Sequence, residues 1–129
     1  MRYLITGGGT GGHIYPALSI ANEIKDRHSS AEILYVGTKE GLEAELVPKE
    51  GFKFETIRVK GMPRSLNKES FIAMKELFLG LKDSKKIIKE FKPDVVIGTG
   101  GYVCGPVVYQ AARKNIATVI HEQNAFPGV

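Results

Sequence analysis

Five of the six residues in Gly7–Gly12 are glycine, and this stretch constrains the chain more than any other part of its sequence. It follows a short apolar run, Tyr3–Ile5, and precedes a segment in which Ile14, Leu18 and Ala21 recur at helical spacing. A glycine-rich turn between a strand and a helix lets a ligand approach the backbone, and it leaves N–H groups free at the positive end of the helix dipole. The stretch therefore predicts an anion site, although a tight turn that binds nothing is the alternative.

Apolar runs typical of buried strands alternate with helical patterns along the rest of the chain. We expect strands at 3–5, 33–36, 52–58, 95–98 and 118–120, and helices at about 12–28, 42–48, 68–91 and 105–114. This alternation predicts βαβ units with right-handed crossovers, and hence a parallel sheet with helices on both faces. The predicted fold is α/β and Rossmann-like, with one domain over residues 1–129.

The composition narrows the class of protein. Of 129 residues, 43% are hydrophobic and 25% are charged, which excludes a disordered or fibrous chain. The single cysteine, Cys104, has no partner for an internal disulfide and is expected to be a packing residue, and no signal peptide is recognised, so we expect the cytoplasm. No apolar run is long enough to span a bilayer, and the net charge of +4 favours anionic partners.

The first glycine stretch also fits other nucleotide motifs. Gly7, Gly9 and Gly12 have the GxGxxG spacing of dinucleotide-binding domains, but the next strand ends in Gly37–Lys39 instead of the acidic residue that would hold a ribose. A P-loop is excluded because no Gly-Lys-Ser/Thr follows the glycines. These observations argue against a dinucleotide oxidoreductase and against a P-loop enzyme.

Two more polar or glycine-rich motifs, Gly98–Tyr102 and His121–Asn124, follow later strands. The carboxyl ends of parallel strands share one edge of the sheet, where ligands bind in open α/β folds. We therefore expect both motifs beside the first glycine stretch. For Tyr102, stacking on a ligand and partial burial stay open, and His121–Asn124 either binds a ligand or satisfies its own polar network.

His13 is the histidine at the mouth of the first helix. Imidazole suits proton transfer near neutral pH, so His13 is a candidate general base, with a positioning role as the alternative. Two histidines together with Glu122 could suggest a metal site, but the sequence has no known metal-motif spacing, and we expect no metal.

The predicted helix at 68–91 is basic and amphipathic. Phe71, Met74, Phe78 and Leu81 share one face, and five lysines crowd the same segment. Either Phe71 and Phe78 pack into the core, or the helix contacts an anionic lipid surface.

Three ordered motifs, Gly7–His13, Gly98–Pro106 and His121–Gly128, resemble those of the MurG family of UDP-N-acetylglucosamine:lipid I N-acetylglucosaminyltransferases. The resemblance implies the N-terminal, acceptor-binding half of a GT-B enzyme, whose C-terminal donor-binding domain lies outside residues 1–129. It implies an inverting transfer of N-acetylglucosamine from UDP-N-acetylglucosamine to the 4-hydroxyl of the N-acetylmuramoyl sugar of undecaprenyl-diphosphate-linked lipid I. The product would be lipid II for peptidoglycan synthesis, with no cofactor.

The resemblance also implies roles for individual residues. His13 is the expected catalytic base. The residues expected to bind the donor are Thr10, Gly11, Gly12 and Asn124. Those expected to bind the acceptor or its diphosphate are Gly8, Gly9, Gly100, Gly101, Tyr102, His121 and Glu122. Those expected to contact an anionic membrane, on the cytoplasmic side of the bacterial inner membrane, are Phe71, Phe78, Leu81 and Lys82.

Two alternatives to a single-chain transferase stay open. The chain could be the membrane-recruiting subunit of a split glycosyltransferase, or a non-enzymatic module that binds phosphoanions. We expect no nucleic-acid partner.

Overall fold

The computed structural model describes residues 1–59 and 68–121. Strands and helices alternate along it, as predicted. The strands are β1 (Arg2–Thr6), β2 (Glu32–Gly37), β3 (Lys53–Thr56), β4 (Val95–Gly98) and β5 (Ala117–Ile120). The helices are α1 (Gly11–Arg27), α2 (Glu43–Lys49), α3 (Lys68–Phe91) and α4 (Cys104–Arg113).

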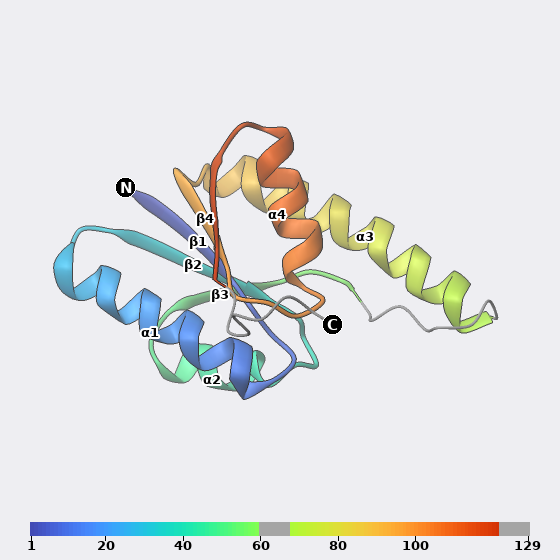
Figure 1. Ribbon diagram of the computed structural model, residues 1–129, viewed down its shortest axis with the longest axis horizontal. Coiled ribbons are helices and arrows are strands. Elements are labelled where there is room, and N and C mark those ends of the chain that lie inside the picture. Colours follow the sequence, from blue (N-terminus) through green and yellow to red (C-terminus); the bar gives the residue numbers. More distant parts are fainter. Residues whose placement is uncertain (60–67, 122–129) are drawn as a thin grey trace, which may run out of the picture.

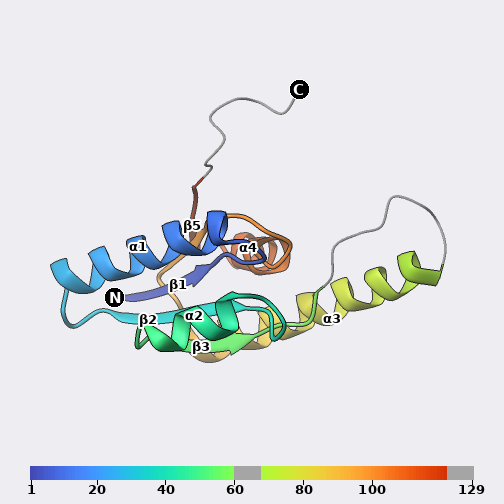
Figure 2. The same ribbon diagram turned by 90° about the horizontal axis from the view of Figure 1, so that it is seen from below.

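The strands form one parallel sheet in the order β3-β2-β1-β4-β5 (Figures 1 and 2). The central strand β1 pairs on both sides, so that Leu4 lies between Leu34 of β2 and Val96 of β4. The strand order changes direction at β1, because the chain moves outward through β2 and β3 and then returns to β4. This is the switch point at which open α/β sheets bind ligands. The predicted Rossmann-like α/β fold is confirmed.

Helices cover both faces of the sheet, as Figure 1 shows. Successive side chains of a strand point to opposite faces, so Leu4 and Ile5 enter different cores. Ile5 packs with Ile14 of α1 and Val47 of α2. Leu4 packs with residues of the other two helices, Ile88 of α3 and Val107 of α4. Burial on both faces explains why β1, β2 and β4 read as continuous apolar runs.

Two local expectations differ from the structure. The third strand was predicted over 52–58, whereas β3 covers only Lys53–Thr56, since it lies at the sheet edge and pairs with β2 alone. The start of the first helix near Gly12 would place Pro16 within about the first turn, where proline is tolerated, but α1 begins at Gly11 and Pro16 is its sixth residue. It therefore has no N–H to donate to the Gly12 carbonyl one turn back, and the helix continues through it.

Helix α3 is longer than the sheet that it covers. Its 24 residues span about 36 Å at 1.5 Å per residue, and in Figures 1 and 2 its N-terminal half projects beyond the strands. Ile87 and Ile88 in the C-terminal half are buried in the core. Within the described ranges, no helix combines the length and the apolarity that crossing a membrane requires.

Candidate functional site

Two glycine loops lie side by side at the carboxyl edge of the sheet. The first glycine loop is Gly7–Gly12, between β1 and α1, and the second glycine loop is Gly98–Tyr102, between β4 and α4. The Gly8 amide donates to the Gly100 carbonyl at 3.2 Å, and the Thr99 amide donates to the Thr6 carbonyl at 2.9 Å. The structure therefore brings together two motifs that are about ninety residues apart in the sequence, as predicted.

The close approach of the two loops depends on glycine in the second one. Gly100 and Gly101 have φ values of +117° and +94°, in the region that favours glycine. A Cβ on Gly101 would collide with the Gly8 carbonyl oxygen, and one on Gly100 would lie 2.6 Å from Cδ2 of His13. These two positions need glycine both for backbone conformation and for space.

His13 lies between the two glycine loops. Its Nδ1 is 3.1 Å from the Gly8 carbonyl oxygen and 3.3 Å from Thr10 Oγ1. A carbonyl oxygen can only accept, so Nδ1 carries the proton and donates. The other ring nitrogen, Nε2, lies beside Gly100 and has no hydrogen-bond partner among the described residues. In the neutral ring Nε2 therefore keeps a lone pair that can accept a proton.

The amides of the first glycine loop divide into two groups. The Gly8 and Gly9 amides donate within the protein, to the Gly100 carbonyl and to a carboxylate oxygen of Glu43 at 3.2 Å. The loop was expected to leave backbone N–H groups free, and this does not hold for these two, because packing of the two loops and α2 satisfies them. The amides of Thr10, Gly11 and Gly12, at the start of α1, have no partner within the described part of the chain. A helix start leaves such donors unsatisfied, so this end of the loop is the one that can bind an anion.

Glu43 was not predicted as part of this site. It is the first residue of α2, it is fully buried, and its carboxylate accepts hydrogen bonds from Gly9 and from Thr38. In sequence it resembles an ordinary acidic residue in a first helical turn, beside the exposed Glu45. The only available signal is its position two residues after Gly41, in the turn that follows a strand end, which is too common to be diagnostic.

Two further side chains support the loops from the core side. The Tyr35 hydroxyl donates to the Gly7 carbonyl at 2.5 Å, and burial raises the pKa of Tyr35 well above its ordinary value, with a further contribution from the nearby Glu43 carboxylate. The Cys104 thiol donates to the Gly100 carbonyl at 3.0 Å, and burial raises the pKa of this thiol. Cys104 therefore packs against the second glycine loop in its neutral form, where it also helps to fix that loop.

Tyr102 and His121 lie at the same edge of the sheet. Tyr102 is 71% exposed, which contradicts the alternative of a partly buried aromatic. His121 is exposed, and its amide donates to the Gly98 carbonyl at 2.8 Å, which ties the end of β5 to the second glycine loop. Glu122 and Asn124 lie outside the described residues.

An apolar hollow of about 360 Å³ adjoins the second glycine loop. It is lined by Gly98, Gly100, Cys104, Gly105, Val108, Tyr109 and Ile120. Because Gly100 also touches the His13 ring, this hollow opens beside the candidate base.

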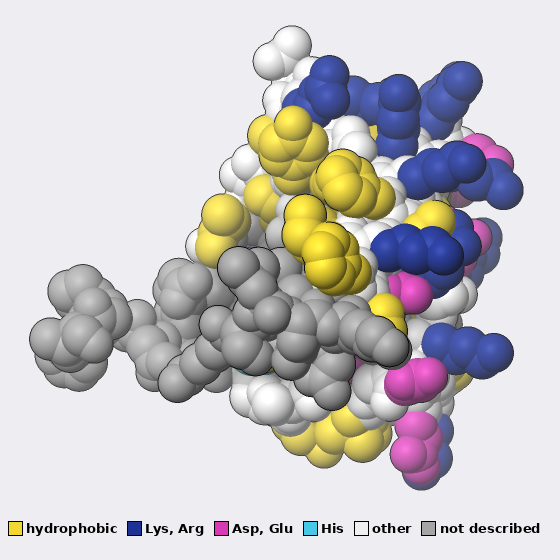
Figure 3. Space-filling view, turned by 90° about the vertical axis from the view of Figure 1, so that its right-hand side faces the viewer, with side chains coloured by type: hydrophobic (Ala, Val, Ile, Leu, Met, Phe, Trp, Pro, Cys, Tyr) yellow, Lys and Arg dark blue, Asp and Glu magenta, His cyan; other side chains and the backbone are white. Residues whose placement is uncertain are grey.

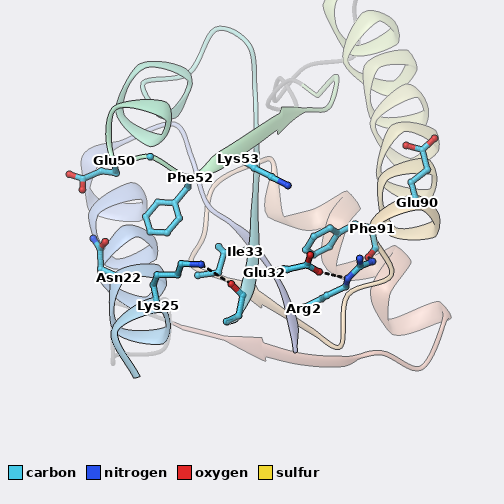
Figure 4. A pocket seen from close by; sticks show the side chains of 12 residues that line it. Arg2, Asn22, Lys25, Glu32, Ile33, Glu50, Phe52, Lys53, Glu90 and Phe91 are labelled. Atoms are coloured by element: carbon cyan, nitrogen blue, oxygen red, sulfur yellow. Dashed lines mark hydrogen bonds and ion pairs between the residues drawn. The ribbon is translucent and has the colours of Figure 1, made fainter. Parts of the chain in front are cut away.

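A larger hollow, of about 550 Å³, lies at the opposite edge of the sheet (Figure 4). Its lining includes Arg2, Glu32 and Lys53 at the amino ends of three strands. Arg2 pairs with Glu32 at 2.5 Å, and the Lys25 ammonium donates to the Ala31 carbonyl at 3.0 Å. None of the residues predicted for the site lines it.

The projecting half of α3 exposes large apolar side chains. Phe71 is 75% exposed and Phe78 is 66% exposed, so the alternative that they pack into the core is wrong. The exposed apolar residues of this helix are Phe71, Ile72, Met74, Leu77 and Phe78. Leu81 is partly buried and Lys82 is exposed. Figure 3, which looks at the side to which α3 projects, shows hydrophobic side chains next to a row of Lys and Arg side chains.

Comparison with known proteins finds relatives that match the chain over its whole length. UDP-N-acetylglucosamine--N-acetylmuramyl-(pentapeptide) pyrophosphoryl-undecaprenol N-acetylglucosamine transferases of Finegoldia magna and a Thermoanaerobacter species are 57% and 60% identical over 129 residues. These alignments cover 100% of this chain but 35% of each relative, so the chain spans about a third of their length. The crystal structure of Acinetobacter baumannii MurG superposes with a TM-score of 0.82 at 28% identity, over 99% of this chain and 36% of that one.

The resemblance to the MurG family that the three motifs indicated is thus confirmed. The sequence profile of the glycosyltransferase family 28 N-terminal domain matches residues 3–129. The chain belongs to glycosyltransferase family 28 and corresponds to the N-terminal domain of that family.

Proposed function

We propose that this chain is the acceptor-binding domain of an inverting GT-B glycosyltransferase. The complete enzyme moves N-acetylglucosamine from UDP-N-acetylglucosamine to the 4-hydroxyl of the N-acetylmuramoyl sugar of undecaprenyl-diphosphate-linked lipid I, and the product is lipid II. Support comes from relatives that carry this activity in their names and are 57% to 60% identical across all 129 residues. A C-terminal domain of the same enzyme supplies most of the contacts to the donor.

The observation that carries the proposal is the setting of His13. Nδ1 is occupied by the Gly8 carbonyl, and Nε2 keeps its lone pair at the edge of the sheet where both glycine loops meet. A base in that position takes the proton from the acceptor hydroxyl as this oxygen attacks the anomeric carbon and UDP departs. The same bond to Gly8 fixes the tautomer, so the ring needs no rearrangement before it accepts the proton.

The proposed ligand contacts follow from the free donors of the site. The amides of Thr10, Gly11 and Gly12 at the start of α1 stabilise negative charge on the donor diphosphate. The acceptor lies along Gly8, Gly9, Gly100 and Gly101 in this proposal. Gly9 is exposed with open space around its Cβ position, and Tyr102 offers an exposed ring. We also propose that His121 and Glu122 contact the acceptor and that Asn124 contacts the donor.

A lipid-linked acceptor requires the enzyme to reach a membrane. We assign this contact to α3, where Phe71 and Phe78 of the projecting half would enter the interface and Lys82, about one turn further along the helix, would face anionic headgroups. In this proposal the protein is peripheral, on the cytoplasmic side of the bacterial inner membrane. Leu81, which is partly buried, is proposed to extend the apolar face of the same helix.

The direct test is a transfer assay with the full-length protein that contains this chain, UDP-N-acetylglucosamine and a soluble lipid I analogue. Formation of the disaccharide by that single protein supports the proposal. A requirement for a second, separately encoded catalytic chain would favour the split-enzyme alternative. Binding of diphosphates without any transfer would favour a non-enzymatic module.

A further inference from the structure

Glu43 is a fully buried acidic residue behind the first glycine loop, and the proposed transfer reaction does not use it as an acid or base. Its carboxyl group fills the space beside three glycines. A Cβ at Gly8, Gly37 or Gly41 would collide with the Glu43 side chain. Burying a carboxylate is costly unless its oxygens receive hydrogen bonds, so its place behind the loop needs an explanation.

The two oxygens of this carboxylate have different partners. Oε1 accepts from the Gly9 amide at 3.2 Å, and Oε2 accepts from the Thr38 amide at 2.8 Å and from Thr38 Oγ1 at 3.0 Å. No Lys, Arg or His among the described residues forms an ion pair with Glu43. The side chain therefore joins the first glycine loop to the segment after β2, through hydrogen bonds from Gly9 and Thr38. We call these three hydrogen bonds the Glu43 clip.

The clipped segment is the one that orients the candidate base. Gly8 touches the Glu43 carboxylate and also presents its carbonyl to Nδ1 of His13. Gly9 is directly followed by the amides of Thr10–Gly12, which have no partner within the described residues. Moving the carboxylate would thus move the acceptor of the His13 hydrogen bond and the start of α1 together.

We propose that Glu43 is a positioning residue that holds Gly8 and Gly9 so that His13 and the amides of Thr10–Gly12 are placed for the transfer reaction. The effect on transfer rests on the function proposed above. The effect on loop conformation does not.

Glu43→Gln in the full-length enzyme tests the clip with little change of shape. The glutamine carbonyl can face the two Thr38 donors, and its NH₂ group must then face the Gly9 amide, which is also a donor. We expect hydrogen exchange in a peptide covering 7–12 to accelerate at least tenfold, with exchange in β1 and β4 unchanged. We expect kcat to fall on the order of 10²-fold, the typical loss for a small misplacement of catalytic groups.

Two further variants separate positioning from folding. Gly41→Ala pushes on the Glu43 carboxylate without removing its charge, so it should reproduce the loop effect even if Glu43→Gln fails to fold. Glu45→Gln changes an exposed carboxylate two residues away on the same helix and should leave exchange and kcat unchanged.

The deciding comparison is between Glu43→Gln and Thr38→Val. Thr38→Val removes the hydroxyl donor on the β2 side and leaves the hydrogen bond from Gly9 to Glu43 in place. If Thr38→Val lowers the Tm as much as Glu43→Gln and lowers kcat equally, or if loop exchange in Glu43→Gln stays within twofold of wild type, Glu43 has no positioning role. A wild-type protein that transfers no sugar would refute the proposed function, and the exchange data would still decide whether Glu43 fixes the loop.

Discussion

The imidazole of His13 makes its polar contacts through one ring nitrogen, Nδ1. This atom lies 3.1 Å from the Gly8 carbonyl oxygen and 3.3 Å from Thr10 Oγ1. A histidine that served structure alone would need only this side of the ring. The other side faces the second glycine loop, with Nε2 near Gly100. Asparagine can imitate the first role, because its side-chain NH₂ is a donor, but it has no nitrogen that accepts a proton at neutral pH.

His13→Asn in the full-length enzyme should therefore lower kcat by roughly 10² to 10⁴-fold, the usual contribution of a general base, with little change in Tm. Transfer kinetics and thermal unfolding measure the two effects. His28→Asn, at the exposed C-terminal end of α1, is the control and should alter neither. Equal activity of His13→Asn and wild type would show that His13 only orients the loop.

Gly101→Ala and Gly105→Ala are a matched pair of variants, one inside the second glycine loop and one in the helix that follows it. Gly101→Ala combines a φ of +94° with a collision against the Gly8 carbonyl, so it should destabilise the protein by about 1–3 kcal/mol or more. Gly105 lies in α4 with nothing within 4 Å of its Cβ position, and Gly105→Ala should stabilise by about 0.5–1 kcal/mol. Urea denaturation measures both, and an unaffected Gly101→Ala would contradict the described contact of the loops.

At the scale of the elements, α3 has two halves with different surroundings. Its C-terminal half buries Ile87 and Ile88 against the sheet, whereas Phe71 and Phe78 remain exposed on the projecting half. Large exposed apolar side chains beside lysines are typical of an interfacial helix. The sequence pattern alone could not distinguish this from a core helix, because both show the same periodicity.

Replacing Phe71 and Phe78 together by serine should weaken binding of the full-length protein to vesicles of anionic phospholipid by at least tenfold, since each buried aromatic contributes about 1.5–3 kcal/mol. Vesicle sedimentation at two salt concentrations measures the effect and its electrostatic part. Leu42→Ser removes an exposed apolar side chain before α2 and should leave vesicle binding unchanged. Undiminished binding of the double variant would remove α3 from the membrane proposal.

An ion pair links α3 to the segment that follows β3. Arg58 donates to Asp83 from its backbone amide and guanidinium, at 2.8 to 2.9 Å, and these hydrogen bonds hold the pKa of Asp83 below its ordinary value. A lowered pKa in the folded state means that the pair stabilises the fold above the ordinary Asp range, near pH 4. This stability is lost as the pH falls through the folded pKa.

Asp83→Asn should thus be less stable than wild type at pH 7, and the difference should shrink below pH 4 and disappear once Asp83 is protonated in both states. Chemical denaturation across this pH range gives the measurement. A difference that stays constant down to pH 2 would mean that packing, and not the charge of Asp83, links the helix to Arg58.

At the scale of the whole molecule, the parallel sheet brings distant motifs to one edge. The sequence separates the two glycine loops by three strands, β2, β3 and β4, and by three helices. They are nevertheless in hydrogen-bond contact because β1 and β4 are neighbours in the sheet. His121 at the end of β5 joins them through its bond to Gly98. The opposite edge carries the larger hollow but none of these motifs.

Titration of this chain, followed by backbone amide NMR shifts, should therefore show two separate responses. A soluble lipid I analogue should perturb Gly9–His13 and Gly100–Tyr102. UDP-N-acetylglucosamine should cause weak shifts or none, because we propose that a C-terminal domain supplies most donor contacts. Tight binding of the donor without a response to the lipid analogue would reverse the proposed division between the two domains.

The sequence by itself determined the order of the elements, the parallel sheet and the edge at which the motifs meet. Periodicity, glycine-rich turns and strand alternation are local signals, and the right-handed crossover rule converts them into topology. The positive φ of Gly100 and Gly101 is also a local property, since that backbone conformation favours glycine.

Tertiary structure alone decided which donors and side chains are free. The Gly8 and Gly9 amides are satisfied by partners far away in the sequence, and Glu43 becomes buried because three glycines leave room for its carboxylate. Phe71 and Phe78 are exposed because α3 is longer than the sheet it covers. Each outcome depends on contacts between segments that no local pattern records, and burial and hydrogen bonding are properties of those contacts.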